Sequence, residues 1–67
     1  MSGKAAQAIR VLIVDDQRAM RSIIRNLLSQ HDISQVAKAE DGAEAMRALL
    51  DLRQPNPNVI ICDLHLE

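Results

Sequence analysis

The chain has 67 residues, a formal net charge of −1 and one cysteine, and it contains no Phe, Tyr or Trp. The small net charge and the lack of aromatic rings that could stack on bases argue against nucleic acid as the main partner. The single cysteine excludes an internal disulfide framework, and the apolar runs are far too short to span a membrane. We therefore expect a soluble, cytoplasmic protein whose short chain supplies only a small hydrophobic core.

The first part of the chain predicts a strand followed by a helix. Residues 1–8 (MSGKAAQA) are small and polar, and we expect them to form a flexible leader. Residues 9–14 (IRVLIV) are rich in β-branched side chains, which is typical of a parallel strand covered on both faces. The apolar residues that follow have the spacing of one helical face, with polar residues opposite. The apolar positions are Met20, Ile23, Ile24, Leu27 and Leu28, and the polar ones are Arg18, Arg21, Ser22, Arg25 and Asn26.

A second strand and a second helix come next. Residues 35–39 (QVAKA) predict a short strand, and Asp41 is expected to cap the helix after it. Glu44 stands three residues after Asp41, where it would complete a capping box. The helix should run from about Ala43 to Leu52, because Pro55-Asn-Pro57 cannot continue it. Its inward-facing residues should be Ala45, Met46, Leu49 and Leu52.

A third strand completes the pattern. Residues 59–62 (VIIC) predict a second buried strand, in which Cys62 would be a small buried apolar residue. Strands and helices then alternate along the whole chain, which indicates an α/β fold with a parallel sheet and right-handed crossovers.

Carboxylates follow two of these strands at the point where each ends. Asp15 and Asp16 end the first strand, and Asp63 ends the third. Ligands of open α/β sheets bind at the carboxyl ends of strands, so the three acids would converge if these strands are neighbours. Like charges repel unless a cation offsets them, and oxygen ligands on a short frame suit Mg²⁺. The alternative is that Asp15 or Asp16 caps the next helix and Asp63 is a turn residue, but the recurrence at two strand ends favours a magnesium site.

Other kinds of site find less support. Gly3 and Gly42 are the only glycines, so the chain has no glycine-rich phosphate loop of a nucleotide hydrolase. His31 and His65 have no partners at zinc-ligand spacing. Three arginines line one flank of the first helix, where a solvated face is favoured over an anion site; they are Arg18, Arg21 and Arg25.

Three segments resemble the receiver domain of two-component response regulators. They are VLIVDDQRAMRSIIRNLL, VAKAEDGAEAMRALL and VIICDL, and the first helix is most similar to the chemotaxis, CheY-like branch. The resemblance covers about Arg10 to Asp63. It implies a flavodoxin-like parallel sheet, here with the strand order 2-1-3 and one helix on each face.

The resemblance also implies a role for each acid. Asp63 would be the phosphoacceptor, whose carboxylate takes a phosphoryl group from a histidine kinase or phosphotransfer protein and so switches an output domain or target protein. Asp16 would bind Mg²⁺ directly, Asp15 through water, and the backbone carbonyl of His65 would be a further ligand. Such a domain is not an enzyme acting on a separate substrate.

The chain departs from the family pattern after the acceptor. Leu66 and Glu67 stand where the family usually has Met-Pro, and His65 stands where a side chain tunes dephosphorylation. The fourth and fifth strands of the family, with a Ser/Thr and a Lys that complete the switch, would follow Glu67. Residues 9–67 would thus be the N-terminal half of a receiver domain, with impaired phosphorylation and a free edge on the third strand through which it self-associates.

Two other functions remain open from the residues alone. One is a Mg²⁺-dependent phosphohydrolase with an aspartate nucleophile, although this class would want a second Asp where His65 stands. The other is an interaction module with a vestigial acidic pocket.

Overall fold

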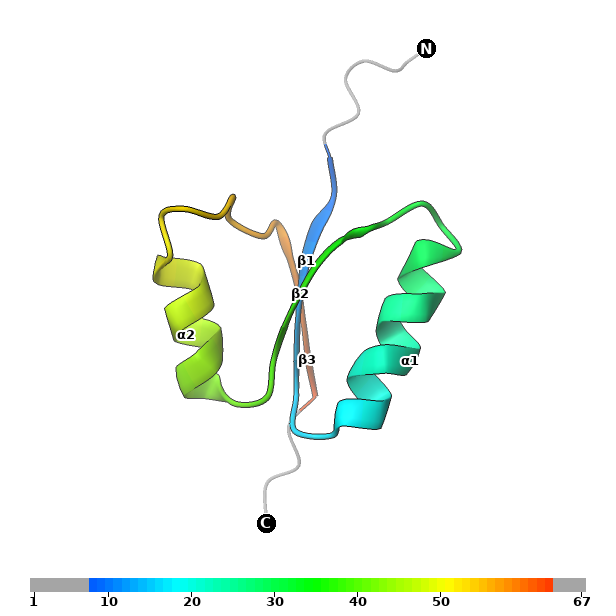
Figure 1. Cartoon of the computed structure of the whole chain (residues 1–67), viewed down its shortest axis with the longest axis horizontal. Coiled ribbons are helices and arrows are strands. Elements are labelled where there is room, and N and C mark those ends of the chain that lie inside the picture. The colour runs from blue at the N-terminus through cyan, green and yellow to red at the C-terminus, as the bar shows by residue number, and fades with distance from the viewer. Residues whose placement is uncertain (1–7, 64–67) are drawn as a thin grey trace.

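The computed structural model describes residues 8–63, which form a parallel sheet with one helix on each face (Figure 1). Strands β2 and β3 both pair with β1, so the order across the sheet is β2-β1-β3. The predicted α/β architecture and the strand order are therefore confirmed. In chain order the elements are β1 (Arg10–Asp15), α1 (Arg18–Ser29), β2 (Gln35–Ala39), α2 (Gly42–Leu50) and β3 (Val59–Asp63).

Strand β1 is the centre of the core. Its residues from Val11 to Asp15 are all buried, because α1 and α2 pack on its two faces and a strand pairs with each of its edges. On the α2 side, Leu12 and Val14 form a cluster with Ala39 and Ala45. Burial on both faces explains why the sequence of this strand is continuously apolar rather than alternating.

The side chain of Asn58 sets the register between β1 and β3. Its Oδ1 accepts the backbone N–H of Arg10 at 2.9 Å, and its Nδ2 donates to the carbonyl of Ala8 at 3.0 Å. The backbone N–H of Asn58 also donates to the carbonyl of Arg10 at 2.9 Å. These bonds fix the start of β3 beside the start of β1, so the residues that follow pair from Val11 with Val59 onward.

Helix α2 begins at the predicted cap. The carboxylate of Asp41 accepts the backbone N–H of Glu44 at 2.8 Å, which satisfies one of the free donors of the first turn. The side chain of Glu44 reaches back further than a regular capping box requires, because its Oε1 accepts the N–H of Glu40 at 2.6 Å.

The end of α2 differs from the prediction. The helix ends at Leu50, because Asp51 adopts an extended conformation and its carboxylate accepts the backbone N–H of Arg53 in a local turn. Leu52, expected to face inward, is 96% exposed, and Met46 is 55% exposed. The prediction for these two residues was wrong, whereas Ala45 is buried and Leu49 packs against the core.

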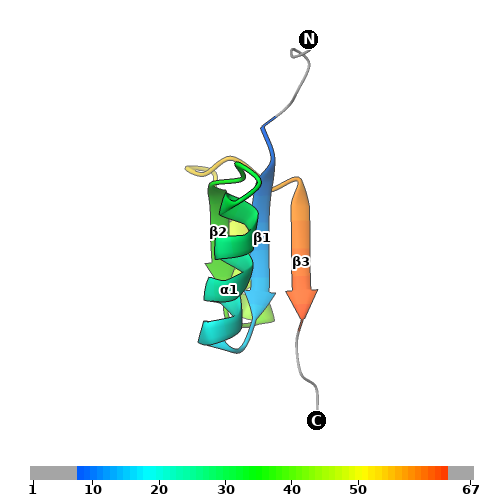
Figure 2. The same cartoon turned by 90° about the vertical axis from the view of Figure 1, so that its right-hand side faces the viewer.

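Strand β3 is much less covered than its apolar sequence predicts. Val59 is 41% exposed, Ile60 is 52% exposed, and the thiol of Cys62 is free and exposed. The reason is the position of the helices, since α1 packs on β1, and α2 packs on β1 and β2. Figure 2 shows β3 beside the region that α1 covers. The expected burial of this strand, and of Cys62, was wrong.

Helix α1 turns a narrower face to the sheet than expected. Its half-buried residues are Arg21, Ile24 and Leu28, at the spacing of one helical stripe. Three residues of the predicted inward face are exposed instead, namely Met20, Ile23 and Leu27. Within residues 8–63 neither helix has the length and apolar character to cross a membrane.

Candidate functional site

Two acidic residues, Asp15 and Asp63, lie side by side at the carboxyl ends of their strands. We call this end of the sheet the acidic edge. All three strands run in the same direction, and their carboxyl ends lie together (Figure 2). The last register pair of β1 and β3 is Asp15 with Asp63. Paired residues of adjacent parallel strands project from the same face, and such strands lie about 4.8 Å apart. The predicted adjacency of the first and third strands is therefore present, and it brings these two acids together.

Asp15 is a buried carboxylate with one unused oxygen. The residue is the last of β1 and is only 1% exposed. Its Oδ1 accepts the backbone N–H of Gln17 at 2.8 Å, whereas Oδ2 is buried and has no hydrogen-bond partner among the described residues. A buried carboxylate oxygen without a partner is costly, and a bound cation would offset this cost. The chemistry of Asp15 thus fits one member of a cation site.

The other predicted ligands are less confined. Asp16 and Asp63 are both exposed, and His65 lies outside the described residues. Within residues 8–63, no three acidic, histidine or cysteine side chains are gathered closely enough to hold a metal ion. The structure therefore aligns the acids at one edge without drawing their side chains into a finished ligand cluster, and the metal-binding roles of Asp15, Asp16, Asp63 and His65 stay predictions.

Helix capping does not explain the acidic pair. The residue that caps α1 is Gln17, and no side-chain hydrogen bond caps this helix. Asp15 binds the N–H of Gln17 itself, which is a local turn before the helix rather than a cap of its first turn. This arrangement removes one alternative explanation for an acid at the end of β1.

Sequence reasoning missed Arg21, which belongs to this region. The sequence favours a solvated flank for Arg21, but the residue is half-buried, and its Nη1 donates to the backbone carbonyl of Asp15 at 2.6 Å. A signal was present in the sequence, because Arg21 has the i, i+3, i+7 spacing with Ile24 and Leu28. An arginine at the border of an apolar helical stripe typically buries its aliphatic stem, and its guanidinium then finds a hydrogen-bond partner.

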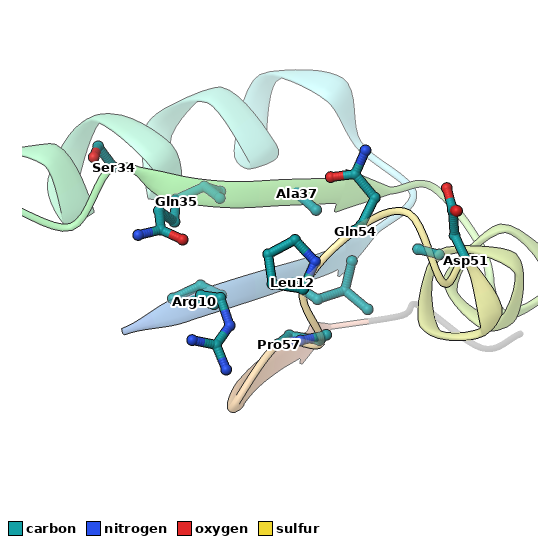
Figure 3. A pocket seen from close by; sticks show the side chains of 12 residues that line it. Arg10, Leu12, Ser34, Gln35, Ala37, Asp51, Gln54 and Pro57 are labelled. Carbon is teal, nitrogen blue, oxygen red and sulfur yellow. The ribbon is translucent and has the colours of Figure 1, made fainter. Parts of the chain in front are cut away.

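A pocket of about 420 Å³ lies at the other end of the sheet (Figure 3). The starts of β1 and β2 and the segment after α2 line it, including Arg10, Ser34 and Gln54. Asp51 also lines it, and the side-chain hydrogen bond from Arg53 lowers the pKa of the Asp51 carboxyl. The pocket lies at the starts of β1 and β2, whereas Asp15 and Asp63 lie at the carboxyl ends of β1 and β3, so the pocket is separate from the acidic edge.

Comparison with known proteins adds independent information. Residues 11–67 match the family model described as the response regulator receiver domain. The chain is 38% identical over 61 residues to a protein-glutamate methylesterase/protein-glutamine glutaminase of Haloarcula marismortui, covering 91% of this chain and 16% of that protein. No solved structure matches the chain.

Two further relatives carry names from sensory signalling. The sensory transduction protein LytT of Enterococcus faecalis is 39% identical over 59 residues, which cover 87% of this chain and 23% of LytT. The chemotaxis protein CheY of Listeria monocytogenes is 34% identical over 56 residues, which cover 84% of this chain and 44% of CheY. The chain thus spans less than half the length of each of these three relatives.

Proposed function

The chain belongs to the receiver-domain family of response regulators, and from this premise we propose that it accepts a phosphoryl group on Asp63. The donor would be the phosphohistidine of a histidine kinase or a phosphotransfer protein. A carboxylate oxygen of Asp63 attacks the phosphorus atom, the phosphorus–nitrogen bond breaks, and the histidine nitrogen keeps the electron pair. The resulting acyl phosphate would switch an output domain or a target protein.

The observation that carries this proposal is the pairing of Asp63 with Asp15. Asp63 is exposed at the end of β3, so a phosphohistidine on another protein can reach its carboxylate. Its register partner Asp15 is buried and holds one oxygen without a partner among residues 8–63. An accessible nucleophile beside a fixed second carboxylate supports a phosphoacceptor site.

We propose Mg²⁺ as the cation of this site, held by Asp15, Asp16, Asp63 and the backbone carbonyl of His65. The donor set consists of oxygen atoms alone, and the unpartnered Oδ2 of Asp15 fits a hard cation. When bound, the ion supplies positive charge that offsets the negative charge of the transferring phosphoryl group. The chain itself orients Asp15 through the N–H of Gln17 and leaves Asp16 and Asp63 accessible from solvent.

The proposed role is that of a phosphoacceptor and not of an enzyme with a separate substrate. One relative is named a methylesterase, but the alignment covers 16% of its length, so that activity supports no proposal for this chain. A cytoplasmic location belongs to the same proposal, because the free, exposed thiol of Cys62 suits a reducing compartment.

Self-association through β3 is a further part of the proposal. Among the described residues β3 pairs with β1 alone, and its exposed apolar side chains flank an edge that can pair with another chain. Parallel pairing in register would place Asp63 against its own copy, where like charges repel. We therefore propose antiparallel pairing of two β3 strands.

A phosphodonor assay tests the phosphoacceptor role. The chain is incubated with acetyl phosphate and Mg²⁺, and intact-mass spectrometry follows the addition of one phosphoryl group. Because phosphorylation of a half domain should be impaired, we expect weak labelling of the wild type, and none above background in Asp63→Asn or after chelation of the metal. Equal labelling of Asp63→Asn would refute the assignment, and an unlabelled wild type would favour an interaction module with a vestigial pocket.

A further inference from the structure

A ring of three hydrogen bonds closes the turn between β1 and α1. The Oδ1 atom of Asp15 accepts the N–H of Gln17 at 2.8 Å. The carbonyl of Gln17 accepts the N–H of Arg21 at 3.1 Å. The Nη1 atom of Arg21 then returns to the carbonyl of Asp15 at 2.6 Å. Each bond joins two of the same three residues, so the end of the strand and the first turn of the helix form one closed unit.

The guanidinium of Arg21 bonds to the backbone at the acidic edge, through the carbonyl of Asp15. Its Nη1 donates to the backbone carbonyl of Asp15, so among residues 8–63 the carboxylate of Asp15 keeps only its bond from Gln17. A hydrogen bond from a charged guanidinium is stronger than one between neutral groups, and Arg21 is half-buried. The bond therefore restrains the backbone of Asp15 without neutralising its side chain.

We infer that Arg21 is a positioning residue of the acidic edge, which holds the turn so that Oδ1 of Asp15 stays bonded to Gln17 and Oδ2 stays available to a ligand. The ring uses Oδ1 and leaves Oδ2 buried without a partner among residues 8–63. Without Arg21, the carbonyl of Asp15 loses the bond from the guanidinium, and the carboxylate can rotate or exchange its two oxygens. This inference rests on the proposed cation site, for which Arg21 acts through Asp15 and contacts no ligand itself.

An electrostatic role and a positioning role of Arg21 predict opposite changes in Mg²⁺ affinity when the guanidinium is removed, so the inference can be tested. Removal of an arginine near a cation site takes away a repelling charge, so a purely electrostatic role predicts tighter Mg²⁺ binding in Arg21→Met. A positioning role predicts weaker binding, by about tenfold, as is typical for residues that orient a metal ligand. Methionine keeps an apolar stem and removes only the guanidinium.

The matched control is Arg25→Met, which makes the same charge change one turn further along α1 on an exposed residue. Mg²⁺ alone is titrated into each variant of the 67-residue chain, and the amide signals of Asp15 and Gln17 are followed by NMR. We expect about tenfold weaker binding in Arg21→Met and wild-type or slightly tighter binding in Arg25→Met. Binding in Arg21→Met that equals or exceeds that in Arg25→Met would overturn the inference.

A second readout needs no metal and separates this inference from the proposed function. The N–H of Gln17 is bonded inside the ring, so its hydrogen exchange in metal-free protein should accelerate in Arg21→Met and stay unchanged in Arg25→Met. A wild type that binds no Mg²⁺ would refute the proposed cation site while this exchange still tests the ring. If Arg21→Met does not fold, Arg21→Leu is used instead, because it also keeps an apolar stem and has no donor for the Asp15 carbonyl, and unchanged exchange of Gln17 there would overturn the inference.

Discussion

Asp15 and Asp63 occupy the same register position on neighbouring strands, yet Asp15 is buried and Asp63 is exposed. The difference follows from their strands. Strand β1 lies between two strands and under both helices, whereas β3 forms the edge of the described sheet and neither helix packs closely on it. One position in the register thus provides both a fixed carboxylate and an accessible one.

Asn58→Ala should destabilise the fold by about 1–2 kcal/mol, because it removes two side-chain hydrogen bonds that align β3 with β1. Urea unfolding followed by circular dichroism measures this change. The control is Asn56→Ala, since Asn56 binds Arg10 through its backbone carbonyl and not through its side chain. Equal destabilisation by both variants would show that the Asn58 side chain does not set the register.

Asp41→Ala should cost about 1 kcal/mol of stability, because the carboxylate caps α2 by accepting the N–H of Glu44. Asp41→Asn keeps an acceptor oxygen in the same place and should lose much less. Thermal unfolding of the two variants compares them directly. A loss in Asp41→Asn as large as that in Asp41→Ala would mean that charge, rather than the cap, carries the effect.

Asp15→Asn should stabilise the metal-free protein, because it replaces a buried carboxylate with a neutral amide. One oxygen of this carboxylate has no partner among residues 8–63. The same change should abolish any stabilisation by Mg²⁺, which acts only through binding to the folded state. Unfolding midpoints with and without Mg²⁺ measure both effects. Asp16→Asn is the exposed control, for which we expect no gain in the stability of the metal-free protein. A gain in stability as large as that of Asp15→Asn would contradict this explanation.

Ile60→Lys should prevent the proposed association of two β3 strands, because a charged residue on an edge strand opposes pairing. Ile23→Lys is the matched control, since Ile23 on α1 is 51% exposed and Ile60 is 52% exposed. Sedimentation over a dilution series should show association for the wild type and Ile23→Lys, but a monomer for Ile60→Lys. A wild type that is monomeric at micromolar concentration would refute self-association.

Much of the fold could be predicted from the sequence, because local patterns decide it. Short stretches of sequence are enough to identify these elements. They are the apolar run from Val11 to Val14, the cap at Asp41 and the prolines after α2. Strand β1 extends one residue further than predicted, to Asp15, so that this acid is part of the buried strand. Such a shift is small in sequence but decides whether the carboxylate is buried.

The prediction was poorest where burial depends on packing between distant elements. An apolar β3 looks buried in the sequence, but coverage depends on where α1 and α2 lie, and they lie over β1 and β2. Arg21 was missed for a different reason, because its spacing with Ile24 and Leu28 indicates a half-buried stem but does not reveal that its head group binds a backbone carbonyl. Leu52 was misplaced because the turn of Asp51 with Arg53 ends α2 early.

The central claim is that the phosphoryl group is carried by Asp63 itself, and site mapping tests it most directly. After reaction with acetyl phosphate and Mg²⁺, borohydride reduces an acyl phosphate to an alcohol and so marks the aspartate that carried it. Peptide sequencing by mass spectrometry should find this conversion at Asp63 and at neither Asp15 nor Asp16. Conversion at Asp15 or Asp16, or at none of the three residues, would contradict the account.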